Sequence, residues 1–230
     1  LEQALSPVRQ MGDRASEAKT LYQIGSGYLV LGETGKALRY LEPALPLSKQ
    51  VGDRASEAKT LYLIGTGYLV LGEKRKALSY LEQALLISKQ MSDRASEGTA
   101  LNTIGAVYAG LGDNRKALSY YEQALPLQKQ VGNRAGEAET LNHIGSVYIA
   151  LGDMPKARSY FEQALPFFKQ VGDRAREART LNNIGTVESG LGDIPKARSY
   201  FEQALPLIKQ TEERALEGLI LDNFATVLGK

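Results

Sequence analysis

Apolar residues recur along this chain with the spacing of one face of an α-helix. Leu141, Ile144 and Tyr148, for example, lie at positions i, i+3 and i+7, and this spacing forms the stripe that an amphipathic helix buries. The chain does not show the alternation of apolar and polar residues that is typical of half-buried strands. The pattern therefore predicts an all-α protein.

The helical pattern is periodic, and the dipeptide Leu-Gly marks each period. It recurs every 40 residues, at positions 31–32, 71–72, 111–112, 151–152 and 191–192. A strict period of this length is typical of stacked helical repeats. Each repeat of such an array buries its apolar face against its neighbours, so the array presents a long surface and favours a binding function.

Each period contains two predicted helices. The first is expected to run from Arg134 to Ala150 in the fourth full repeat and to end near Gly152, because glycine readily adopts the left-handed conformation that closes a helix. Asp153 is a good N-cap for the second helix, and Gly172 is expected to end it.

These boundaries predict a single array over residues 1–230. Residues 1–12 form part of a second helix, and residues 213–230 form a terminal first helix. Between them lie five repeats, at 13–52, 53–92, 93–132, 133–172 and 173–212. The first residues align with the middle of a repeat, so we expect the chain to be a piece of a longer array.

Composition narrows the possible functions. The chain has 28 basic and 26 acidic residues, interspersed along every repeat, for a net charge of +2. It therefore has no basic stripe for nucleic acid or for an anionic membrane, and no apolar run approaches the ~20 residues of a membrane-spanning helix. Without cysteine it can form neither disulfides nor thiolate sites. We expect a cytoplasmic protein with neither nucleic-acid nor membrane partners.

The residues that could support catalysis are few. His143 is the single histidine, so a base beside a nucleophile or a set of metal ligands would be hard to build. One glutamate recurs near the start of the first helix of each repeat, where a carboxylate stabilises the helix dipole. We predict that the chain is not an enzyme and has no catalytic residue, cofactor or metal site.

The repeat resembles a known family. The resemblance is carried by Leu21-x-x-Ile24-Gly25-x-x-Tyr28 and Ala37-x-x-x-Leu41-x-x-Ala44. This pattern is similar to the tetratricopeptide repeat, with leucine in place of the usual tryptophan. The 40-residue period resembles the repeats of Pins-type scaffolds, kinesin light chains and bacterial signalling proteins. The resemblance implies a right-handed superhelix, an α-solenoid whose first helices line a concave groove.

The same resemblance predicts where the two helices of a repeat approach each other most closely. Glycine recurs at one position of the first helix, where a side chain would keep the helices apart. These glycines are Gly25, Gly65, Gly105, Gly145 and Gly185. We expect them to be packing residues.

The positions expected to face the groove vary most between repeats. One column reads Tyr22, Tyr62, Asn102, Asn142, Asn182 and Asp222. In the first repeats Tyr22, Tyr62 and Leu63 offer apolar surface to an anchoring side chain. The asparagines of later repeats can pair with both the N–H and the C=O groups of an extended peptide.

By resemblance to scaffold repeats, we assign peptide contact to three asparagines of this column, Asn102, Asn142 and Asn182. Asn183 and Asn223 lie beside them in the neighbouring column, and His143 lies in that same column. The alternative is that these are polar, solvent-facing residues inherited by duplication. The predicted function is a scaffold that binds an extended segment of a partner protein. The alternative function is a regulatory or sensor module that controls an attached effector domain.

Two further residue groups leave questions open. Glu188 stands where earlier repeats have tyrosine, and a buried carboxylate needs a partner. Either its surroundings are wetter than expected, or it pairs with a cation such as Arg179 or Arg198.

The terminal helix carries Leu219 and Phe224 with no second helix after them, so we expect end-to-end association at high concentration.

Overall fold

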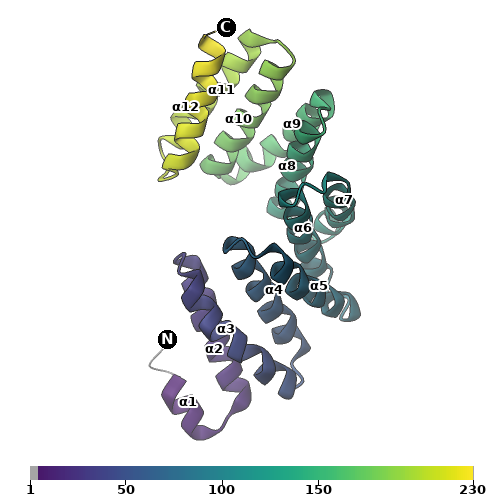
Figure 1. Cartoon of the computed structure of the whole chain (residues 1–230), viewed down its shortest axis with the longest axis vertical. Helices are drawn as coiled ribbons and strands as arrows, with labels where there is room; N and C mark the ends of the chain where they lie inside the picture. The colour runs from purple at the N-terminus through teal and green to yellow at the C-terminus, as the bar shows by residue number, and fades with distance from the viewer. Residues whose placement is uncertain (1–4, 230) are drawn as a thin grey trace. The chain divides into compact units, whose positions relative to one another are not determined.

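The computed structural model describes residues 5–229, and the regular structure of these residues is entirely helical. Figure 1 shows helices that follow one another in antiparallel pairs, with α1 shorter than the rest. The helices are α1 Leu5–Met11, α2 Arg14–Val30, α3 Thr34–Gln50, α4 Arg54–Val70, α5 Lys74–Gln90, α6 Arg94–Gly110, α7 Asn114–Gln130, α8 Arg134–Ala150, α9 Met154–Val171, α10 Arg174–Gly190, α11 Ile194–Ile208 and α12 Arg214–Leu228. The predicted all-α solenoid fold is confirmed.

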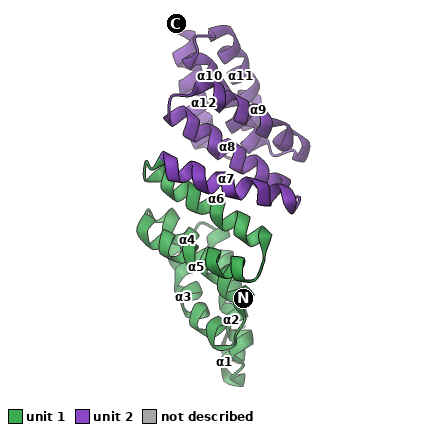
Figure 2. Cartoon of the chain, turned by 90° about the vertical axis from the view of Figure 1, so that its right-hand side faces the viewer, with its two compact units in different colours: residues 1–113 green, residues 114–230 purple. Residues whose placement is uncertain are grey.

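The chain divides into two compact units, residues 1–113 and residues 114–230, which Figure 2 shows in green and purple. In unit 1, α2 pairs with α3 and α4 pairs with α5, while α3 also packs on α4 and α5 on α6. In unit 2, the same order continues from α7 to α12. The assignment of one array with the repeat limits given above stays a prediction.

The predicted helix limits are confirmed in the repeat that contains α8 and α9. Helix α8 spans Arg134–Ala150, and Gly152 follows with a φ of 79°. The Asp153 side chain caps α9, because it accepts a hydrogen bond of 3.2 Å from the Lys156 backbone N–H. Gly172 ends α9 in the left-handed conformation that glycine adopts without strain. The glycine and aspartate signals thus act as the sequence indicates.

In four helix pairs, α2–α3, α4–α5, α8–α9 and α10–α11, a glycine lies against a large side chain of the second helix. A Cβ atom on Gly145 would lie 2.8 Å from Cε1 of Phe161, which is fully buried. Gly185 faces Phe201 in the same way. In unit 1 the facing side chain is leucine, and a Cβ on Gly25 would lie 2.5 Å from Cγ of Leu41. The predicted close approach is confirmed at Gly25, Gly65, Gly145 and Gly185.

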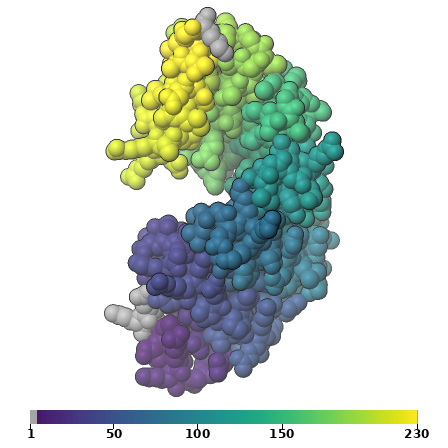
Figure 3. Space-filling model, viewed as in Figure 1, coloured from purple at the N-terminus to yellow at the C-terminus, as the bar shows by residue number. Residues whose placement is uncertain are grey.

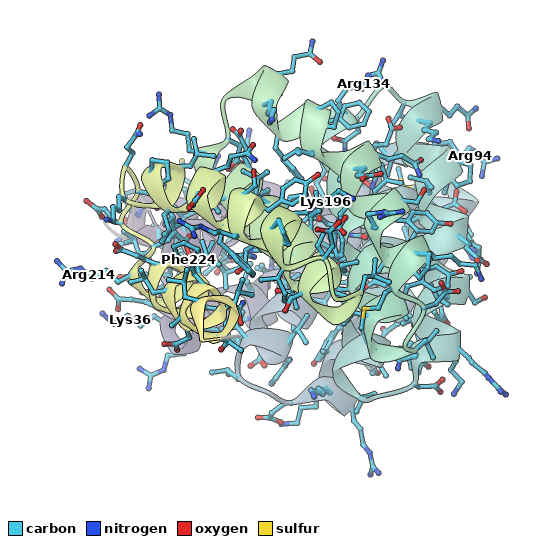
Figure 4. The ribbon with its side chains drawn as sticks, turned by 90° about the horizontal axis from the view of Figure 1, so that it is seen from above. Lys36, Arg94, Arg134, Lys196, Arg214 and Phe224 are labelled. Carbon is cyan, nitrogen blue, oxygen red and sulfur yellow. The ribbon has the colours of Figure 1, made fainter. Side chains whose placement is uncertain are left out.

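The core of unit 2 extends from these contacts to the last helix. Phe201 packs with Ala178, Leu181 and Ile220. Phe224 of α12, labelled in Figure 4, places its ring centroid 6.1 Å from that of Phe201.

None of the helices within residues 5–229 has the length and apolar character needed to cross a membrane.

We expect Gly145→Ala to lower the free energy of unfolding by about 1–2 kcal/mol. Overpacking costs roughly 1–3 kcal/mol, and the better helix propensity of alanine offsets up to about 1 kcal/mol. Gly27→Ala is the matched control, because Gly27 also lies within a helix but has no atom within 4 Å of an added Cβ. It should be neutral or stabilising. Urea unfolding measures both, and equal destabilisation of the two variants would contradict the close-contact role.

Candidate functional site

Unit 1 contains a cavity of about 320 Å³ between α4, α5 and α6, which we call the α4 cavity. Its lining is made mostly of small or apolar side chains. These include Ala58, Tyr62, Leu63, Ala84, Ser88 and Ala100. Tyr22 of α2 and Lys59 of α4 also line it. The structure therefore brings together Tyr22, Tyr62 and Leu63, the apolar candidates of the first repeats.

A second cavity, the α2 cavity, lies next to the first in unit 1. It measures about 560 Å³ and is lined by α2, the end of α3 and the start of α4. Lys19, Ser48 and Asp53 contribute to its lining. Tyr22 and Lys59 border both cavities, so the two lie side by side along successive repeats.

A serine in the second helix of each early repeat leaves this space. Ser88 lies in the same repeat position as Phe168, which is buried in unit 2 against Ala138, Leu141 and Ala164. The corresponding alanines of unit 1, Ala58 and Ala84, line the α4 cavity instead. This column is not among the candidate residues predicted above, and its signal in the sequence is the series Ser48, Ser88, Gln128, Phe168 and Ile208.

Asn142 in unit 2 has one satisfied and one unsatisfied side-chain atom. Its Nδ2 donates a 2.8 Å hydrogen bond to Oγ1 of Thr180. The Thr180 hydroxyl itself donates to the Arg176 carbonyl oxygen, which fixes the orientation of the amide. Oδ1 of Asn142 is buried without a hydrogen-bond partner among the described residues, and buried acceptors normally have one.

Of the other asparagine candidates, Asn102 and Asn182 are more buried than Asn142. Asn182 is 2% exposed, and its Oδ1 accepts a 3.0 Å hydrogen bond from Nδ2 of Asn223. Asn183 is half-buried beside it. In unit 1, Asn102 is 8% exposed. Peptide contact by these asparagines stays a prediction, and the pairing of Asn182 with Asn223 leaves less of both amides for a ligand.

His143 is half-buried in unit 2, with its ring centroid 5.2 Å from that of Tyr121. Burial lowers the pKa of the imidazole below its ordinary value of 6.5. The nearby Glu139 favours the protonated form, whereas Arg179 and Arg176 oppose it.

Within residues 5–229 no group of three histidine, cysteine or acidic side chains could hold a metal ion.

Glu188 is buried and pairs with a cation, which confirms the second of the two expectations for this residue but not the cations named for it. Its Oε1 lies 3.3 Å from Nη1 of Arg158, and only 2% of the residue is exposed. Arg179 pairs with Glu213 instead, and Arg198 with Glu202. Wet surroundings and the two suggested partners are therefore wrong, because the cation comes from the preceding repeat.

The Arg158–Glu188 pair replaces an apolar contact of other repeats. The positions of Arg158 and Glu188 correspond to Leu38 and Tyr68, which belong to one apolar cluster in unit 1. A tyrosine in this column stacks on the next helix, as Tyr148 does on Tyr160 with ring centroids 5.5 Å apart. Glu188 thus has a structural explanation, and its burial does not indicate a catalytic acid.

Comparison with known families gives an extended match. A family model described as "Tetratricopeptide repeat" matches residues 16–90, 76–130, 96–170 and 136–210. No curated protein matches the chain in sequence.

Solved structures resemble the fold closely at low sequence identity. BtubC (BKLC) from P. vanneervenii has a TM-score of 0.79 and 21% identity, with 91% of this chain and 88% of that chain covered. The apo quorum sensor NprR from B. thuringiensis has a TM-score of 0.81 and 22% identity, with 96% and 63% covered. A signal-transduction ATPase with a tetratricopeptide repeat sensor from Pyrococcus horikoshii has a TM-score of 0.78 and 21% identity, with 94% and 33% covered.

We expect Arg158→Leu to lower the free energy of unfolding by about 1–3 kcal/mol, because it leaves a buried carboxylate without its cation. Adding Glu188→Tyr should restore most of the loss by recreating the apolar pair of the other repeats. The control is Arg198→Leu in the same column, whose surface pair with Glu202 should contribute at most about 1 kcal/mol. Urea unfolding measures the series. A double variant no more stable than Arg158→Leu would refute the compensation.

We also expect His143 to make folding sensitive to acid. Because its pKa is lowered in the folded protein, its contribution to stability is complete above the ordinary pKa of 6.5 and is lost as the pH falls through the lower folded value. His143→Gln should therefore lose less stability than the wild type on acidification below pH 6.5. Thermal unfolding across this pH range measures the difference, and parallel curves would contradict the expectation.

Proposed function

Because this chain belongs to the tetratricopeptide repeat family, whose stacked helices serve protein interaction, we propose that it binds an extended peptide segment of a partner protein. The single observation that carries the proposal is the pair of adjoining cavities in unit 1, which share Tyr22 and Lys59. Two adjoining recesses with tyrosine in their walls suit an extended chain that anchors itself by its side chains.

The tyrosines favour this use because they offer large contact areas at a low cost in conformational entropy. Tyr62 is held in place, since its hydroxyl lies 3.2 Å from Oγ1 of Thr103, which itself donates to the Thr99 carbonyl oxygen. A preformed wall loses little freedom on binding, which favours affinity.

The unpaired oxygen of Asn142 is a second feature that fits a peptide ligand. A peptide N–H group is the donor that such an acceptor lacks, and an extended backbone presents one at every residue except proline. Asn142 is half-buried as a residue, and its Oδ1 is buried.

The alternative function is a sensor module that controls an attached effector domain. One structural neighbour is a quorum sensor, and another carries a tetratricopeptide repeat sensor. This chain spans 63% of the first and 33% of the second. As a sensor, the chain would use the same recesses, and ligand binding would change the behaviour of a neighbouring domain.

Three related expectations remain proposals: that the chain is not an enzyme, that it is cytoplasmic and that it associates end to end. The last is favoured by α12, drawn in yellow in Figure 3, where Leu219 and Leu221 are exposed. Light scattering over a range of protein concentrations tests the association, and a monomer throughout would contradict it.

The peptide-binding proposal is tested by selecting a phage-displayed library of random dodecapeptides on the 230-residue chain. Selected peptides should bind the double variant Tyr22→Ala/Tyr62→Ala at least about tenfold more weakly, because burying an aromatic side chain contributes roughly 1.5–3 kcal/mol. Fluorescence anisotropy measures the dissociation constants.

The control is Tyr148→Ala/Tyr160→Ala, which removes two tyrosines from a stacked pair in unit 2. It should leave the binding unchanged while both variants remain folded by circular dichroism. Failure to select any peptide, or equal losses in the two double variants, would refute peptide binding at these cavities.

A further inference from the structure

We propose that the α4 cavity takes one large apolar side chain of the bound peptide and that Lys59 and Lys19 select an acidic residue beside it. This inference rests on the proposed peptide binding and adds the chemistry that the peptide must carry. Its elements are the volume of the cavity, the serine that opens it and the two lysines along the recess.

The size of the α4 cavity suits a single side chain. An apolar cavity of about 150 Å³ accommodates a benzene molecule, and the α4 cavity measures about 320 Å³. A phenylalanine, leucine or methionine side chain therefore fits with some space remaining. The alanines at positions 58, 84 and 100 provide apolar walls without projecting into this space.

The serine that opens the cavity offers little to a polar ligand. The Ser88 hydroxyl donates a 3.0 Å hydrogen bond to the Ala84 carbonyl oxygen of its own helix. Ser48 does the same with Ala44 in the α2 cavity. Since each hydroxyl already has an acceptor, the polar group is satisfied internally, and an apolar occupant leaves no donor unpaired.

The charge beside the cavities favours an acidic neighbour. Lys59 lines both cavities and Lys19 lines the α2 cavity. Neither ammonium group lies within ion-pair distance of a carboxylate in the described residues. Hydrogen bonds from serine lower the pKa of Asp53 and Asp93, and the charge of Lys59 adds to this lowering at longer range. Asp53, the acidic residue that lines the α2 cavity, is engaged as a helix cap, because its carboxylate accepts hydrogen bonds from the Ser56 backbone N–H and hydroxyl. The lysines are therefore available to a ligand carboxylate.

The arrangement suits a peptide better than a compact molecule. The two cavities adjoin through Tyr22 and Lys59 but belong to successive repeats. Neighbouring helices pack with their axes roughly 8–10 Å apart, a distance that an extended peptide spans in about three residues. An apolar anchor in the α4 cavity and an acidic residue within about three positions of it can thus be satisfied together.

The test compares peptide selections on the wild type and on Ser88→Phe. Phenylalanine already occupies this repeat position as Phe168 in unit 2, so the substitution should fill the cavity without unfolding the chain. We expect wild-type peptides to contain a large apolar residue with Asp or Glu within about three positions, and to lose about ten- to hundredfold in affinity for Ser88→Phe. The matched control is Ser79→Phe at an exposed position of the same helix, which should bind as the wild type does.

The charge is tested with Lys59→Glu, which should shift the enriched neighbour from Asp and Glu to Lys and Arg. Selected peptides that bind Ser88→Phe as tightly as the wild type would overturn the anchor assignment while leaving peptide binding intact. Unchanged neighbour preferences in Lys59→Glu would overturn the acidic assignment. Equal affinity for N-acetyl-phenylalaninamide and for the whole peptide would show that the cavity is a small-molecule site. Selection of no peptide at all would overturn this inference together with the proposed function.

Discussion

The structure depends on the contact between a glycine of the first helix and a large side chain of the second. The Phe161 ring against Gly145 and the Leu41 side chain against Gly25 lie so close to the glycine that a Cβ atom on it would have no room. Interiors packed this closely have few voids. Because this contact recurs with little change, each repeat places its other side chains in nearly the same frame.

Because the repeats share nearly the same backbone frame, the effect of a substitution can be understood by comparing the same position in two repeats. Where Phe168 fills the space over Ala138 and Ala164, Ser88 leaves the corresponding space open. Where earlier repeats pair leucine with tyrosine, unit 2 pairs Arg158 with Glu188. The first change creates a recess at little cost because the serine hydroxyl bonds to its own helix. The second keeps a buried position satisfied, since the carboxylate and its cation were exchanged together.

The parts of the fold that follow local rules could be predicted from the sequence. Helix α8 has its expected limits because glycine and aspartate determine helix ends within a few residues. The glycine contacts could be predicted because the family pattern places them. The partner of Glu188 could not be predicted from its own helix, since Arg158 lies in the preceding repeat. Comparing the two columns, in which leucine becomes arginine and tyrosine becomes glutamate, would have suggested the pair.

Only part of the candidate site could be predicted from the sequence. Tyr22, Tyr62 and Leu63 were identified by their variation between repeats, and they do line one cavity. Ser48 and Ser88 could not be predicted in the same way, because they belong to the second helix of each repeat, which is not expected to line the groove. The asparagines of one column are identical in sequence, yet Asn182 bonds to Asn223 while Oδ1 of Asn142 has no partner among the described residues.

The chemistry of a position in a repeat protein therefore depends on the residue that faces it from the next repeat. Amides that pair with a peptide backbone do not read its side chains, so under the proposed function we expect selectivity to come from the recesses that small residues such as Ser88 leave open.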